Sequence, residues 1–164
     1  MLDPCIEADG GIVKSKNIHA PDLTQRPPRS PRTTLGGYAI LPRCLDKGRA
    51  LLVGKNGEYH YACPLDERFF EFVGIKANDL KKQLALGKGD GEILEWINTH
   101  GKHKREPWEI AQWSALQGQR GPADLESREY FSGLLAKLSK KREDILSWAD
   151  LLDLDDYVSF GGKA

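Results

Sequence analysis

Arginine recurs with a regular spacing in the part of this sequence that is richest in reactive side chains. Residues 26–32 read RPPRSPR, which places Arg26, Arg29 and Arg32 three residues apart among three prolines. A polyproline II helix repeats about every 3 residues, so this spacing predicts three guanidinium groups along one edge of an extended arm. Guanidinium groups bind phosphate or carboxylate through parallel hydrogen bonds. The arm is therefore a candidate anion-binding surface.

Two other interpretations of the arm are open at this point. The arm can lie along the body of the protein with its arginines paired to acidic residues near the C-terminus, since surface charges often neutralise one another locally. Those acidic residues are Asp150, Asp153, Asp155 and Asp156. Alternatively, Pro28-x-x-Pro31 with its flanking arginines matches the ligands of aromatic grooves on partner proteins.

A pair of glycines follows the arm. Gly36 and Gly37 precede Tyr38, and two adjacent glycines permit a positive φ or let bare backbone amides approach a ligand oxygen. This segment joins the arm to the next helix, so we include all three residues in the candidate ligand-binding site. The plain alternative is a tight turn.

Three charged side chains share one turn of the helix predicted over 42–53. Arg43, Asp46 and Lys47 lie at positions i, i+3 and i+4. If this turn is buried, Asp46 is a carboxylate held between two cations and can orient a ligand or act as a base. If it is exposed, the three charges form a solvated network of small energetic value.

Cys63 is the candidate nucleophile. It lies in the run YHYACPLD at 59–66, where Pro64 is suited to the first position of a helix. A cysteine at a helix N-terminus near a histidine has features that favour a thiolate, although a small buried cysteine is the plain alternative. The functional hypothesis is an enzyme acting on small molecules, with a pocket between the first two helical segments. Its residues are Asp46, Tyr59, Tyr61, Cys63 and Asp66.

Several kinds of site are disfavoured by the motifs. The sequence has neither G-x-G-x-x-G nor G-x-x-x-x-G-K-[ST], which argues against the two commonest nucleotide-binding loops. His60 with Cys63 and His100 with His103 resemble halves of a zinc site, but the pairs are far apart and one lies in a lysine-rich loop. We therefore expect no metal site and no cofactor.

Composition limits the partners and the compartment. The chain has 164 residues, with 24 Lys and Arg against 24 Asp and Glu, so no overall field attracts nucleic acid or an anionic membrane. Three cysteines form an odd, unpatterned set, which favours a reducing, cytoplasmic setting over a secreted disulfide framework. No apolar run approaches the roughly 18 residues of a membrane span. We expect a soluble protein that binds an anionic small molecule or a protein partner.

Helical periodicity dominates the rest of the chain. Helices are predicted over 42–53, 64–73, 77–86, 90–100, 108–117 and 124–138, with Gly118 ending the fifth and Asp90 capping the fourth. A last helix is predicted to carry Ile145, Trp148 and Leu152. The fold class is all-α, a compact bundle of about six or seven short helices with an extended Pro/Arg-rich N-terminal arm. We expect a mobile leader over 1–21, one helical domain over 22–160 and a tail over 161–164.

Several of these segments together resemble a known family. They read DLT, RPPRSPR, LGGY, LPR, LDK and GRA, followed by EYHYACPLD and GDGEILEWI. The combination resembles a bacterial family catalogued as a domain of unknown function, over about 22–160. The resemblance implies a self-contained helical fold and a bacterial cytoplasmic setting, and it carries no activity to transfer. The leading hypothesis is thus a non-catalytic binding or interaction domain with an anion-accepting surface. That surface consists of Arg26, Arg29, Arg32, Arg43 and Lys47.

Overall fold

Seven helices make up most of the part that the computed structural model describes, residues 17–164. They are α1 (Leu41–Leu52), α2 (Pro64–Val73), α3 (Ala77–Ala85), α4 (Asp90–His100), α5 (Pro107–Gln119), α6 (Leu125–Leu138) and α7 (Trp148–Ser159). Within these residues the strand-type pairing is confined to one isolated bridge, between Leu35 and Tyr38. The predicted all-α class is confirmed.

A tight turn leads the arm into α1. Leu35 and Tyr38 exchange two backbone hydrogen bonds, of 3.1 and 3.0 Å, around Gly36 and Gly37. Both glycines have a positive φ, 58° and 85°, which a side chain would make costly. A Cβ on Gly36 would also lie 2.6 Å from the side chain of Leu94. The plain-turn interpretation therefore describes this segment.

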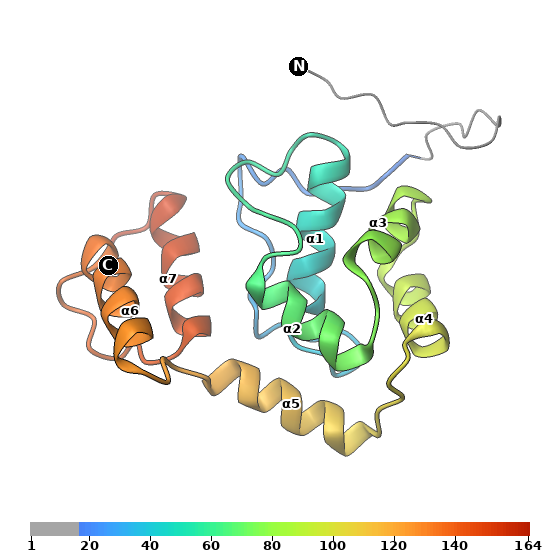
Figure 1. Ribbon diagram of the computed structural model, residues 1–164. Helices are drawn as coiled ribbons and strands as arrows, with labels where there is room; N and C mark the ends of the chain where they lie inside the picture. Colours follow the sequence, from blue (N-terminus) through green and yellow to red (C-terminus); the bar gives the residue numbers. More distant parts are fainter. Residues whose placement is uncertain (1–16) are drawn as a thin grey trace.

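Two hydrophobic clusters hold the helices together. The larger one gathers side chains from α1 to α4 and includes Leu45, Phe69 and Leu84. The smaller one joins α6 to α7 around Phe131 and Leu154, and we call these two helices the α6–α7 pair. Figure 1 shows this pair beside the α1–α4 body, with α5 running below the body from α4 towards α6. A single domain over 22–160 remains a prediction, and most of the predicted leader lies outside the described residues.

The end of α5 differs from the prediction. Gly118 does not stop this helix, which continues to Gln119. The reason is a contact from the arm, because Arg32 donates a hydrogen bond of 3.1 Å to the carbonyl oxygen of Gly118. A cation at this position also interacts favourably with the negative end of the helix dipole. Long-range contact thus extends a helix that local propensity would end.

The start of α7 also differs from the prediction. The helix begins at Trp148, because Ser147 caps it by accepting a hydrogen bond of 3.0 Å from the backbone N–H of Asp150. Ile145 therefore precedes the helix, and its side chain is buried in the smaller cluster.

Arg32 of the arm connects α7 to the rest of the molecule. Its guanidinium lies 2.5 Å from Asp150 and 3.1 Å from Asp153. The hydroxyl of Ser30 adds a hydrogen bond of 3.0 Å to Asp153. The pairing of the arm with the acidic C-terminal residues is thus present, and Arg32 is the arginine that makes it.

Acid should weaken the attachment of α7 through Asp150. Burial by itself raises the pKa of Asp150, but hydrogen bonds from Ser147 and Arg32 outweigh it and lower the pKa to about 2. An unfolded aspartate titrates at about 3.9, so the folded state binds fewer protons and this contribution is full above about pH 4 and lost towards about pH 2. We expect Asp150→Asn to be less stable than the wild type near neutral pH, with most of that difference gone at about pH 2.

Urea denaturation at the two pH values measures this effect. Glu143→Gln is the matched control, since Glu143 forms no ion pair with any residue of the described chain. A difference for Asp150→Asn that stays constant down to the lower pH would contradict the assignment.

Candidate functional site

Helix α1 carries four charged side chains into the interior. Every residue from Leu41 to Ala50 is buried, and Arg43 and Lys47 are each only 3% exposed. Each charge has a partner from another element: Arg43 with Asp156, Asp46 with Arg29, Lys47 with Asp66, and Arg49 with Asp90. The turn is buried, as one of the two alternatives requires, but Asp46 pairs with Arg29 and is not held between Arg43 and Lys47 as predicted. The four pairs connect α1 to α7, to the arm, to α2 and to α4.

Arg29 is the arginine of the arm that is most fully engaged. Its side chain donates hydrogen bonds of 2.9 and 2.8 Å to the two oxygens of Asp46 and one of 2.7 Å to Asp90. Burial by itself lowers the pKa of Arg29, but these two carboxylates outweigh it and raise the pKa. Asp90 is the first residue of α4, and its carboxylate is a partner of arginines. It is not the cap of this helix that the sequence predicts.

The three arginines do not lie along a common edge as polyproline II geometry predicts. Arg29 extends to α1 and α4, whereas Arg32 extends to α7. Arg26 is exposed and forms no ion pair in the described part of the chain. The physical reason is that two of the guanidinium groups reach carboxylates on different helices, and these contacts fix their directions.

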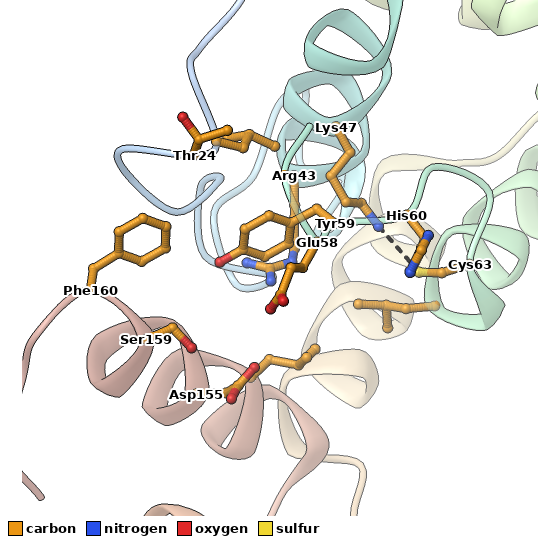
Figure 2. A pocket seen from close by; sticks show the side chains of 14 residues that line it. Thr24, Arg43, Lys47, Glu58, Tyr59, His60, Cys63, Asp155, Ser159 and Phe160 are labelled. Atoms are coloured by element: carbon orange, nitrogen blue, oxygen red, sulfur yellow. Dashed lines mark hydrogen bonds between the residues drawn. The ribbon is translucent and has the colours of Figure 1, made fainter. Parts of the chain in front are cut away.

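A cavity of about 570 Å³ opens where the α6–α7 pair meets the larger body, and we call it the Cys63 cavity. Its walls come from α1, the loop before α2, the start of α2 and the end of α7 (Figure 2). The sequence-based prediction includes four of its residues, Arg43, Lys47, Tyr59 and Cys63. It misses others, among them Thr24, Glu58, Asp155, Ser159 and Phe160.

Lys47 joins Cys63 to a buried carboxylate. Its Nζ lies 3.1 Å from Sγ of Cys63 and 2.8 Å from Oδ2 of Asp66 (the first contact is dashed in Figure 2). Burial by itself lowers the pKa of Lys47, but Asp66 and Cys63 together raise it, so the side chain is an ammonium. Asp66 is fully buried, and neither of its oxygens accepts a hydrogen bond of regular geometry from another described residue. The ion pair with Lys47 thus compensates the buried negative charge of Asp66.

Cys63 lies at the N-terminus of α2, directly after a residue with a left-handed backbone conformation. It is the N-cap residue of α2, with Pro64 at the first helical position as predicted, and its side chain is half-buried. Ala62 directly before it has φ 58°, a left-handed conformation that is uncommon for a residue other than glycine. The other described cysteine, Cys44, is fully buried, and burial raises the pKa of its thiol. Cys63 is therefore the thiol that a ligand in this cavity can meet.

A second group of buried charges forms another wall of the Cys63 cavity. Arg43 donates hydrogen bonds of 2.6 and 3.2 Å to the two oxygens of Asp156, and the hydroxyl of Tyr59 donates one of 2.7 Å. Burial and then Asp156 raise the pKa of Tyr59, so its hydroxyl stays protonated. Burial and the charge of Asp156 also raise the pKa of Asp155, which faces the cavity. Arg43 and Tyr59 are thus held in place by α7.

Other predicted site residues line a separate cavity of about 540 Å³, which we call the arm cavity. Arg26, Arg29 and Asp46 lie in its wall, together with Arg49, Lys88 and Asp90. Four cations thus face two carboxylates, in addition to the imidazole of His19. The structure therefore divides the predicted site between two cavities.

The remaining predicted residues have structural surroundings. Tyr38 is buried in the larger cluster, with its ring 5.5 Å from that of Phe69, and the hydroxyl of Tyr61 donates a hydrogen bond of 2.8 Å to the carbonyl of Ala77. Asp66 pairs with Lys47 and is not among the residues that line the Cys63 cavity or the arm cavity. These positions, like Gly36 and Gly37, support the fold around the cavities.

The sequence holds a signal for the ion pairs of α7 and α1, beyond the acidic residues already considered as partners of the arm. Asp150, Asp153 and Asp156 are three residues apart, which places them on one side of α7, and all three accept hydrogen bonds from arginines. Arg49 lies three residues after Asp46 and extends the charged side of α1. Charges repeating at helical spacing therefore mark both helices as partners in ion pairs.

A comparison with protein-family models relates this arrangement to other sequences. The family described as "Domain of unknown function (DUF5069)" matches residues 25–158. The chain belongs to this family. The DUF5069 match contains the arm arginines, all seven helices but the last residue of α7, and Cys63 with Lys47 and Asp66. A search of curated proteins finds no match to this DUF5069 chain.

Residues 17–164 were compared with the requirements of a metal site and of a membrane span. No group of three or more His, Cys, Asp and Glu side chains is placed there to hold a metal ion. None of the helices there combines the length and the apolar character that crossing a membrane requires.

Breaking the buried pair of Arg43 and Asp156 should lower the free energy of unfolding strongly. Removing one partner of a buried ion pair leaves an uncompensated charge, so we expect Asp156→Asn to lower the free energy of unfolding by about 3–5 kcal/mol. Asp153→Asn on the same helix removes a half-exposed partner and should cost about 1 kcal/mol or less. Urea denaturation of both variants measures the difference, and similar losses for the two would contradict the importance of burial.

Proposed function

We propose that this protein binds a small molecule in the Cys63 cavity and that Cys63 is its reactive group. The observation that supports this most directly is the ammonium of Lys47, which lies between the sulfur of Cys63 and the buried carboxylate of Asp66. A thiol beside a cation at a helix N-terminus is typical of nucleophilic cysteines. We also infer a bacterial cytoplasmic setting from the family resemblance and the cysteine content.

Each neighbour of Cys63 has a distinct role in this proposal. Lys47 stabilises negative charge on the sulfur, and Asp66 keeps Lys47 charged and in place. The N-terminus of α2 adds the positive end of a helix dipole. Cys63 first releases its S–H proton to water, and the resulting thiolate attacks an electrophilic carbon of the ligand, so that an S–C bond forms while the bond from that carbon to its leaving group breaks and the leaving group keeps the electron pair. This is the enzyme hypothesis from the sequence, without Asp46 and Tyr61.

The reactivity of Cys63 towards iodoacetamide tests this proposal. We expect Cys63 in the native protein to be alkylated at least about threefold faster than glutathione near neutral pH, because a neighbouring cation stabilises the attacking thiolate. Cys44 should stay unmodified until the protein unfolds, since it is fully buried. Mass spectrometry of the peptides measures each rate separately.

Two variants make this measurement specific. Cys63→Ser should remove the fast reaction, and Lys47→Met should slow it while the far-UV circular dichroism spectrum shows that the helices are retained. A native Cys63 that reacts no faster than glutathione, or one that keeps its rate in a folded Lys47→Met variant, would contradict the proposal.

A second candidate function is the binding of a small anion in the arm cavity, which keeps Arg26 and Arg29 of the leading hypothesis from the sequence but not Arg32, Arg43 or Lys47. It is favoured by the four cations there, one of which, Arg26, has no ion-pair partner in residues 17–164. Two carboxylates already neutralise part of this charge. The positive charge that remains available to bind an anion is therefore that of Arg26 and Lys88.

Titration with inorganic pyrophosphate tests the arm cavity. We expect binding at low salt that weakens as salt rises, since exposed charges are screened. Arg26→Gln should weaken binding at least about tenfold, as expected for the loss of a charged hydrogen-bond donor. Arg128→Gln changes an exposed arginine elsewhere and should leave binding unchanged. Equal binding by these two variants would contradict a site in the arm cavity.

A further inference from the structure

A third cavity, of about 600 Å³, lies between α2, α6 and α7. Most of its wall is apolar, with Leu65, Leu134, Leu138, Trp148, Leu151 and Leu152 among the lining residues. It shares Cys63, Leu65, Leu152 and Asp155 with the Cys63 cavity, so the two spaces adjoin. Its volume is within the range of about 300–1,000 Å³ that is usual for small-molecule sites.

Cations without carboxylate partners line this apolar space. Arg68 of α2, Arg120 at the end of α5 and Lys137 of α6 all face it, and none of them forms an ion pair with any residue from 17 to 164. The acidic residue in the wall is Asp155. Three cations, of which Arg120 is half-buried and Arg68 and Lys137 are exposed, therefore face one carboxylate.

Arg120 shows most clearly that this charge lacks compensation. Its Nε is buried and has no hydrogen-bond acceptor among the described residues. Burial, and then the positive charge of Arg68, lower the pKa of Arg120. Arg120 is half-buried and Arg68 is exposed, and an anion between the two guanidinium groups would offset the positive charge that lowers the pKa of Arg120. A buried donor without an acceptor is also a group that a ligand can satisfy.

We propose that this cavity binds an apolar carboxylate, whose anionic group is held by Arg68 and Arg120 and whose hydrocarbon body lies against Leu134 and Trp148. Guanidinium forks match the two oxygens of a carboxylate. The leucine-rich wall excludes a strongly hydrated ligand such as a sugar phosphate, because burying its hydroxyl groups without hydrogen bonds costs free energy. A metal cation is excluded by the positive charge of the wall. The inference goes beyond the proposed function, since it does not require Cys63 to be reactive.

Calorimetric titration of the full chain with octanoate tests this proposal, with octanamide as the neutral molecule of the same shape. We expect octanoate to bind saturably and octanamide to bind at least about tenfold more weakly, which is the usual effect of losing a charge-assisted hydrogen bond. Arg68→Met and Arg120→Met should each weaken octanoate binding to a similar extent, because methionine keeps an apolar stem. Arg128→Met on the exposed part of α6 is the matched control and should bind octanoate as the wild type does.

The fluorescence of Trp148 locates the bound octanoate. Trp148 lines the cavity and its ring packs edge-on against Phe131, so Trp148→Phe is a conservative change. We expect octanoate to change the tryptophan emission of the wild type and not that of Trp148→Phe, while the calorimetric signal remains in both.

Three results would overturn the proposal: no saturable binding of octanoate, equal binding of octanoate and octanamide, or wild-type binding by both folded arginine variants. An emission change that persists in Trp148→Phe would do the same, because it would place the ligand elsewhere. The alkylation rate of Cys63 is measured without octanoate. Failure of this proposal is therefore distinguishable from failure of the proposed function.

Discussion

The buried ion pairs of α1 are the constraint on which the rest of the structure depends. Taking a guanidinium or an ammonium out of water costs several kcal/mol unless an opposite charge meets it with good geometry. Helix α1 can therefore occupy the interior only when the arm, α2, α4 and α7 each bring a partner to it. A hydrophobic helix in the same place would accept many neighbours, whereas these pairs specify which element lies on which side.

Local features of the sequence predict much of the fold. Gly74 ends α2 with φ 71°, and Ile75 donates a backbone hydrogen bond to Phe70, as the glycine-stop pattern indicates. The errors occur where a distant residue intervenes. Gly118 stays helical because Arg32 binds its carbonyl, and such a contact depends on packing that periodicity does not describe. Helix class and most helix ends are thus local properties, while the remaining ends are not.

The candidate site is less predictable than the fold for the same reason. Pro64 indicates from the sequence alone that Cys63 precedes a helix. That the ammonium of Lys47 would meet its sulfur depends on the angle at which α1 crosses α2. The separation of Asp46 from Lys47 is a similar case, because neighbours along a helix point in different directions and meet different partners. Residue types and spacing predict which side chains belong to a site, and tertiary packing determines which of them line the same cavity.

The two hydrophobic clusters have a consequence for the precision of the cavities between them. The two clusters share no residue, and Arg32, Arg43 and Tyr59 join the α6–α7 pair to the larger body through hydrogen bonds to α7. Apolar surfaces slide over one another at little cost, but paired hydrogen bonds fix direction as well as distance. The spacing of the walls around Cys63 and Trp148 should therefore depend on these polar contacts, and a change in one ion pair at α7 would alter the shape of both cavities.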